Sequence, residues 1–217
     1  MTALELNPNE NDKVSTQYYL ATTKYRLNDT AGAIEGHNQV LSINPDYFSA
    51  KYALVYIKYP PLLNTLYDKE GWSDKWHKLE VEYLSEIIKI YPKAISSYRD
   101  IIIKYAYLRN YEEVIKYSIT LVELSNNQGK EITASDYSQI VWAYRNTKKL
   151  YKAISFYNKT LEIDPLFPQT IAGLGTTKLY LGDVNGTCEK LNKAINLEKI
   201  SDDSKQHYSS LITENCK

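Results

Sequence analysis

The chain is poor in the residues that interrupt regular structure: its 217 residues include only 8 glycines and 7 prolines. So few of them among many helix-compatible residues favour long, regular helices. Long apolar runs are also missing, because the most apolar segment, YALVYIKYPPLL, is interrupted by Lys58, Pro60 and Pro61. A bilayer-spanning helix needs about 20 apolar residues in a row. The sequence therefore predicts no membrane span.

A surplus of charge of either sign is absent as well. The 26 Lys and Arg residues balance 26 Asp and Glu residues, and the pI is about 6.8. General nucleic-acid binders need a basic surplus to neutralise phosphates. We therefore expect no nucleic-acid partner, although a local basic patch is compatible with this balance.

Little in the sequence could carry catalysis. The three histidines, His37, His77 and His207, are far apart and none stands in a metal-ligand spacing such as HExxH. GLGTTK, at 173–178, lacks the spacing of a phosphate-binding loop, and no pair of carboxylates stands out. We expect no catalytic residue, no metal and no cofactor. His37 falls at a packing position, whereas His77 and His207 are expected at the surface or its boundary.

What the sequence does contain is a thirteen-residue pattern that occurs twice. AIEGHNQVLSINP ends at Pro45, and AISFYNKTLEIDP ends at Pro165. Reading back from these prolines gives two blocks of 34 residues, 14–47 and 134–167. Each block holds two apolar-periodic runs joined by a short polar turn, and apolar spacings of 3, 4 and 7 indicate amphipathic helices. The chain is therefore predicted to repeat a helix–turn–helix unit.

Further blocks follow the same register. Residues 95–128 and 168–201 match it with weaker residue identity. Residues 48–94 begin and end like a repeat but are roughly a dozen residues too long. The excess lies around PPLLNTLYDKEGWSDKW, which we expect to lengthen the turn and the second helix.

The two ends of the chain extend the pattern. Residues 1–10 have the form of the end of a second helix, with Pro8 in register. We therefore expect the chain to begin inside a repeat, with further sequence upstream. Residues 202–217 predict one more amphipathic helix, with Ser201 or Asp202 as N-cap and a polar outer face.

This pattern resembles the tetratricopeptide repeat (TPR) family. The shared features are a small residue at the eighth position, Tyr or a long side chain at the eleventh, a small residue at the twentieth and Pro at the thirty-second. The residues that carry the match are Ala21, Ala33 and Pro45, then Tyr144, Ala153 and Pro165, then Gly175 and Ala194. The resemblance implies an all-α, right-handed superhelical solenoid of helix–turn–helix hairpins with a C-terminal capping helix.

The resemblance also implies a concave groove lined by the first helix of each hairpin. Its expected partner-binding residues are Tyr18, Tyr25, Arg26, Tyr52, Tyr56, Arg99, Tyr107, Trp142, Arg145 and Tyr180. Tyr, Trp and Arg dominate interface hot spots. Alternatively, many of these tyrosines pack between hairpins. The Lys and Asn of the two-carboxylate clamp that grips chaperone tails are missing from these positions.

We therefore predict a non-catalytic interaction module that binds a peptide or helical segment of a partner protein. The alternative is a regulatory or substrate-docking part of a larger enzyme or cell-envelope assembly. Trp72 and Trp76, in the excess of residues 48–94, form a second candidate surface or fold back onto the longer helix. The oligomeric state stays open.

The two cysteines, Cys188 and Cys216, have two interpretations. If the last two helices are antiparallel, these residues face each other and a disulfide staples the final helix to the array. That bridge implies an oxidising compartment, and envelope TPR proteins often carry such cysteines near the C-terminus. Alternatively, both are free buried thiols. An extracytoplasmic location, in the bacterial periplasm or envelope, is favoured if the N-terminus is truncated, and a cytoplasmic one otherwise.

Overall fold

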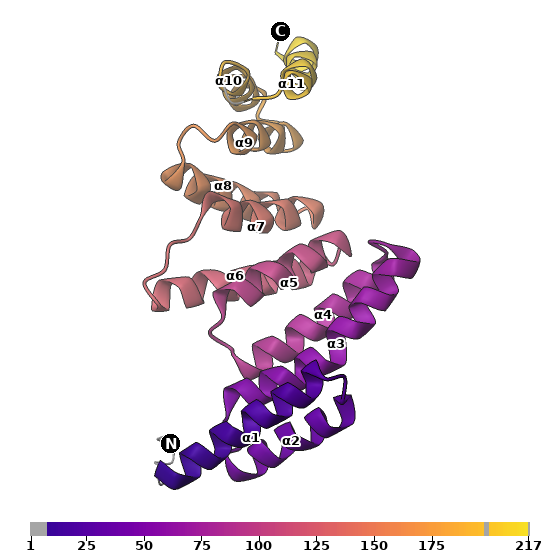
Figure 1. Ribbon diagram of the computed structural model, residues 1–217. Helices are drawn as coiled ribbons and strands as arrows, with labels where there is room; N and C mark the ends of the chain where they lie inside the picture. The colour runs from indigo at the N-terminus through magenta and orange to yellow at the C-terminus, as the bar shows by residue number, and fades with distance from the viewer. Residues whose placement is uncertain (1–7, 198–199, 217) are drawn as a thin grey trace. The chain divides into compact units, whose positions relative to one another are not determined.

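A computed structural model describes residues 8–197 and 200–216 of the chain. Regular structure in these ranges is entirely helical (Figure 1). The chain divides into two units, residues 1–97 and residues 98–217. The helices are α1 (Pro8–Arg26), α2 (Thr30–Ile43), α3 (Phe48–Glu70), α4 (Asp74–Ile90), α5 (Ile95–Tyr107), α6 (Tyr111–Asn127), α7 (Ala134–Asn146), α8 (Leu150–Ile163), α9 (Pro168–Tyr180), α10 (Val184–Ile195) and α11 (Asp202–Asn215).

Unit 1 consists of two hairpins, α1–α2 and α3–α4, with α2 packed on α3. Val14, Val40 and Ala50 form a buried core between them. Small residues allow the first hairpin to close tightly, since a Cβ added at Gly36 would lie 2.7 Å from the Ala21 Cβ. Residues 8–10 form the first turn of α1, and the rest of the stretch predicted to end a preceding helix lies outside the described residues.

The second hairpin departs from the sequence prediction. The excess of residues 48–94 does not lengthen the turn, because only residues 71–73 separate α3 from α4. It extends the first helix, which was not predicted, to 23 residues. The second helix has 17 residues against 14 in α2, so the prediction holds for that helix. The helix runs through Pro60 and Pro61 although neither can donate an i→i−4 hydrogen bond. Helix α4 packs along it, and Trp76 Nε1 of α4 donates to the Leu63 carbonyl at 3.2 Å.

Unit 2 continues with helices that each pack on the next, from α6 through α11. Tyr105 of α5 stacks on Tyr117 of α6, with ring centroids 5.5 Å apart. The C-terminal core contains Ile171, Leu191 and Ile200, and partly buried side chains of α11 cover it. No residue of α11 is itself fully buried. The last helix therefore closes the core with one face and leaves the other to solvent.

Four of the hairpin turns share one backbone conformation. A residue with positive φ stands just before the second helix of four hairpins: Asn28, Arg109, Lys148 and Gly182. Three of the residues that follow, Asp29, Asn110 and Asp183, cap the next helix by accepting a backbone N–H through their side chains. Left-handed backbone suits glycine, but only Gly182 is one. The four turns therefore have the same backbone conformation at this position, although the residue there differs.

The described helices contain none long and apolar enough to span a membrane.

Candidate functional site

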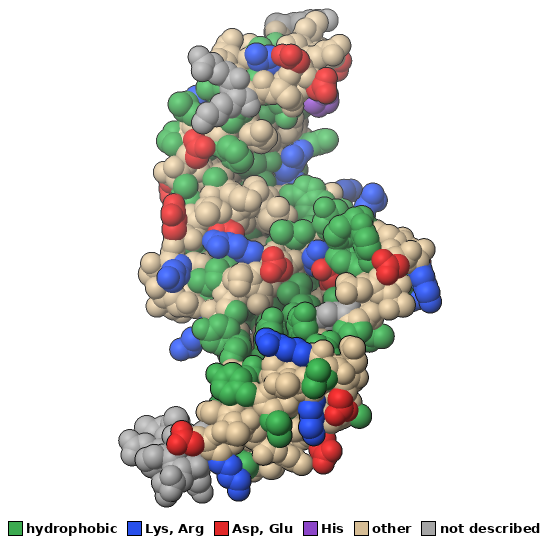
Figure 2. All heavy atoms as spheres, viewed as in Figure 1, with side chains coloured by type: hydrophobic (Ala, Val, Ile, Leu, Met, Phe, Trp, Pro, Cys, Tyr) green, Lys and Arg blue, Asp and Glu red, His purple; other side chains and the backbone are tan. Residues whose placement is uncertain are grey.

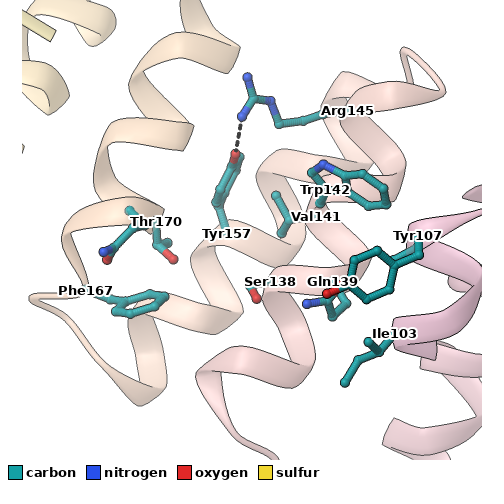
Figure 3. A pocket seen from close by; sticks show the side chains of 12 residues that line it. Ile103, Tyr107, Ser138, Gln139, Val141, Trp142, Arg145, Tyr157, Phe167 and Thr170 are labelled. Atoms are coloured by element: carbon teal, nitrogen blue, oxygen red, sulfur yellow. Dashed lines mark hydrogen bonds between the residues drawn. The ribbon is translucent and has the colours of Figure 1, made fainter. Parts of the chain in front are cut away.

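A pocket of about 570 Å³ lies in unit 2 among α5, α7, α8 and the start of α9 (Figure 3). We call it the main pocket. Its lining residues are Ile103, Ala106, Tyr107, Ser138, Gln139, Val141, Trp142, Arg145, Tyr157, Phe167, Gln169 and Thr170. Helix α7 contributes five of the twelve, more than any other element, because residues three and four apart share one helical face. Aromatic and aliphatic side chains predominate in this lining.

Exposed aromatic side chains form one wall of the main pocket. Trp142 is 37% exposed and Tyr107 63% exposed, and both were expected in a partner-binding groove. The Trp142 ring packs edge-to-face on Tyr111, with centroids 4.9 Å apart, so its orientation is fixed. Figure 3 shows Trp142 and Tyr107 on one side of the pocket and Phe167 on the other. The site therefore presents large, rigid apolar surface to a ligand.

Arg145 brings a positive charge to the same pocket. Its Nη1 donates to the Tyr157 phenol oxygen at 3.3 Å, as the dashed line in Figure 3 shows. Burial raises the pKa of the Tyr157 phenol, and the Arg145 charge and hydrogen bonds with Thr177 and Arg145 oppose this only in part. The phenol is therefore neutral at physiological pH. A Cβ at Gly173 would lie 2.4 Å from that oxygen, so a glycine gives the ring its room.

A second opening, the side pocket, shares Trp142 and Arg145 with the main pocket. It has a volume of about 640 Å³ and is lined by Trp142, Arg145, Asn146, Lys148, Leu150 and Tyr180. Tyr180, another expected groove residue, is 74% exposed here. The main pocket and the side pocket therefore meet at Trp142 and Arg145.

Arg99 has a different environment from the other expected groove residues. Its Nε and Nη2 donate to the two carboxylate oxygens of Asp136, at 2.9 and 2.8 Å. Asp136 also accepts from the Thr133 backbone and completes the capping box of α7. Burial acts to raise the Asp136 pKa, but the hydrogen bonds from Arg99 and Thr133 and the Arg99 charge outweigh it and lower that pKa. The Arg99 charge is thus compensated within the protein.

Unit 1 holds the other expected groove residues around a pocket of its own, of about 420 Å³. Its lining residues are Tyr18, Thr22, Tyr25, Arg26, His37, Tyr52, Ala53, Tyr56 and Ile57. His37 is buried and packs against Tyr18, with centroids 5.4 Å apart, in keeping with its packing position. Its Nδ1 has no hydrogen-bond partner in the described part of the chain, and burial lowers the pKa of the imidazole.

The tip of the α3–α4 hairpin gathers aromatic rings. Trp76 is buried, and Trp72 packs on it with centroids 4.5 Å apart while remaining 65% exposed. Trp76 therefore covers α3, and Trp72 is left at the surface. The prediction that His77 lies at the surface or its boundary is wrong, because it is only 4% exposed beside these rings. Its ring packs edge-to-face on Trp76, with centroids 5.2 Å apart.

Of the two interpretations of the cysteines, the structure contains the disulfide, Cys188–Cys216, with Cα atoms 5.7 Å apart. It joins the first half of α10 to the end of α11.

Sequence reasoning missed part of the main pocket. Tyr157 and Phe167 lie outside the first helices on which the prediction relied. Gly173 was the available signal for Tyr157, because a glycine inside a helix often marks the close approach of another group.

Within residues 8–197 and 200–216, no group of three or more His, Cys, Asp or Glu side chains is arranged to hold a metal ion.

Comparison with known proteins identifies the fold. No protein-family model and no curated protein sequence matches the chain. Among solved structures, it is similar to YrrB, described as a TPR protein with an unusual peptide-binding site, at 16% identity and a TM-score of 0.57 over 89% of this chain and 90% of that one. It is also similar to MamA from Desulfovibrio magneticus RS-1, at 16% identity and a TM-score of 0.53 over 88% and 98% of the two chains.

The chain is also similar in structure to yeast Tom70, which is a longer protein. The identity is 15% and the TM-score 0.57, over 93% of this chain and 39% of Tom70. The chain therefore has the TPR fold, and the all-α class of helical hairpins predicted from its sequence is confirmed. At these identities the likeness shows the fold alone.

Proposed function

We propose that this chain is a protein-interaction module that binds a segment of a partner protein, extended or helical, in the main pocket. The observation that carries the proposal is the exposed Trp142 ring beside a pocket of about 570 Å³. A large aromatic side chain held in one orientation buries much area at little entropic cost, which is why such residues anchor interfaces. Tyr107 enlarges the same surface.

The likeness to YrrB supports this proposal, since that protein is described by its peptide-binding site. The site would act by preorganisation: Trp142 is fixed by Tyr111, and Arg145 by Tyr157. Little side-chain entropy is then lost on binding. We propose that the module is non-catalytic, because its sequence offers no combination of nucleophile, base and orienting group.

The test uses peptides as defined probes. A random peptide library displayed on phage is selected on the immobilised full chain, and the dissociation constants of enriched peptides are measured by fluorescence anisotropy. Trp142→Ala should weaken binding by about thirtyfold, the effect of losing one aromatic hot spot worth about 2 kcal/mol. Tyr151→Ala is the matched control, since Tyr151 is an exposed aromatic residue of α8, 78% exposed, that lines neither pocket.

Circular dichroism of both variants checks that helical content is unchanged. If Trp142→Ala binds the selected peptides as tightly as the wild type, the main pocket is not the binding site.

A second function, as the docking part of a cell-envelope assembly, draws on the Cys188–Cys216 disulfide. Disulfides persist in oxidising compartments. We propose that the partner is met in such a compartment. Blocking of free thiols in intact source cells, followed by mass spectrometry, tests this, and capped thiols at both cysteines would contradict it.

A further inference from the structure

The two pockets carry two cationic side chains that form no ion pair within the part of the chain that the structure describes. Arg145 lines both pockets and Lys148 lines the side pocket, and neither lies within ion-pair distance of a carboxylate in the described residues. The neighbouring Lys149, by contrast, pairs with Glu112 at 3.0 Å. Neither Asp nor Glu lines the main or the side pocket. An anionic group entering there would meet attraction from two cations and no repulsion from the lining.

The surroundings of Arg145 strengthen that attraction. It is half-buried beside Trp142 and Val141, and charges act more strongly near apolar walls than in bulk water. A guanidinium has five N–H donors. The one hydrogen bond that the Arg145 side chain makes in the described part of the chain goes to the neutral phenol of Tyr157. Donors suited to a bidentate bond with a carboxylate therefore remain.

Tyr157 also fixes where Arg145 points. Tyr157 is 5% exposed, and Gly173 gives its ring room in the α8–α9 interface. Arg145 lines both pockets, and the hydrogen bond drawn in Figure 3 holds it there before any ligand arrives. Such preorganisation raises affinity because the charged side chain has already lost its rotational freedom.

The junction indicates what kind of carboxylate fits. The side pocket continues beyond Arg145 towards Lys148 and Tyr180, so space for a ligand does not end at the guanidinium. A chain that placed its C-terminal carboxylate on Arg145 would leave the side pocket empty. A segment that runs through both pockets instead brings an Asp or Glu side chain to this point.

We propose that the bound segment is acidic: an apolar side chain occupies the main pocket beside Trp142, an internal Asp or Glu binds Arg145, and acidic character continues towards Lys148. This proposal rests on the proposed function and specifies its partner chemistry.

The experiment compares two peptide libraries on phage, one with fixed flanking residues on both sides and one with a free C-terminus. Both are selected on the full chain, on Arg145→Gln and on the charge-matched control Lys152→Gln, an exposed lysine of α8 that lines neither pocket. Wild type and Lys152→Gln should enrich flanked peptides that combine an apolar residue with Asp or Glu. Arg145→Gln should enrich apolar peptides without that acidic preference.

Synthetic peptides then measure how much the acidic side chain contributes to binding affinity. Replacing the selected Glu by Gln should weaken binding to the wild type about tenfold, the loss of one charge-assisted hydrogen-bonded pair. The same replacement should make little difference with Arg145→Gln. Lys148→Gln should reduce the preference for Glu about twofold to threefold, because it removes one more distant charge.

Tyr157→Phe tests the positioning role. It keeps the ring and removes the oxygen that holds Arg145. The Glu-over-Gln preference should fall, and by a larger factor than the affinity for the Gln peptide. A merely structural role would weaken both peptides equally.

Three results would overturn the proposal. Enriched peptides that need Trp142 but show no acidic preference would refute the acidic partner while leaving the proposed function intact. Acidic enrichment confined to the free C-terminal library would show that the site recognises chain ends. Failure to select any Trp142-dependent peptide would refute the proposed function itself.

Discussion

Arg99 and Asp136 tie α5 to α7 through two parallel hydrogen bonds, 2.9 Å from Nε to Oδ1 and 2.8 Å from Nη2 to Oδ2. Both helices contribute to the main pocket, so this ion pair helps to hold the two sides of the site. Bidentate charge-assisted pairs are among the stronger polar contacts in proteins. Asp136 is 7% exposed, which makes the loss of its partner or its charge costly.

Asp136→Asn should lower the free energy of unfolding by about 2–3 kcal/mol at pH 7, because it weakens the Arg99 pair and the capping box of α7 together. The folded pKa of Asp136 lies below its unfolded value near 3.8. The stabilisation is therefore complete above that value and is lost as pH falls through the folded pKa. Urea unfolding at pH 7 and pH 3 measures both effects. Asp100→Asn, at an exposed residue of α5, is the control and should change little.

His37 should make the protein less stable in mild acid. Burial lowers its folded pKa below the unfolded value near 6.5, so the unfolded chain binds the proton more readily. The stability is complete above the unfolded pKa and is lost as pH falls through the folded pKa. His37→Phe should flatten the change in urea midpoint between pH 7.5 and pH 5. The exposed His207, changed to Gln, should leave that change intact, and equal slopes in the wild type and His37→Phe would contradict the prediction.

The Cys188–Cys216 disulfide should stabilise the C-terminal end. The loop-entropy model gives about 3–4 kcal/mol for a loop of this length. Cys188→Ser with Cys216→Ser should raise amide hydrogen exchange in α11 and α10 far more than in α7. Denatured wild-type protein should show no free thiol before reduction and two after it. Unchanged exchange in the double variant would mean that packing alone holds α11.

Gly36→Ala should destabilise unit 1 by about 1–3 kcal/mol, because the new Cβ would lie 2.7 Å from the Ala21 Cβ. Ala21→Gly alone should also destabilise, through a helix-propensity loss of about 1 kcal/mol and a small void. Together the two changes restore one methyl group at the contact. A double-mutant cycle should therefore give a favourable coupling, and strict additivity would show that the contact is not the cause.

The sequence predicted the fold well because the period of its apolar residues reports directly on helices and turns. Prolines mark where several helices end: α2 ends just before Asn44-Pro45 and α8 just before Asp164-Pro165. The same rule misled at Pro60 and Pro61, where α3 continues. There α3 packs along α4, and local signals carry no information about such packing.

The candidate site was harder to predict, for a related reason. Helical spacing placed Trp142 and Arg145 on one face of α7, and they do line one pocket. Spacing along one helix could not reveal that Arg99 pairs with Asp136, 37 residues away, because the pairing depends on how two helices pack. Nor could it place Tyr157 beneath Arg145. The repeat positions predict the direction in which a side chain points. Which residue of another helix it contacts can be read only from the tertiary structure.

Because sulfur joins Cys216 to Cys188, a pulling force applied at the C-terminal end does not have to peel α11 from the protein. The load passes through the covalent bridge into α10, and the residues between the two cysteines carry none of it. If this end is tethered to a larger assembly, unfolding under tension must then begin at α10 or earlier. Helix α11 lies in the segment that bears no load.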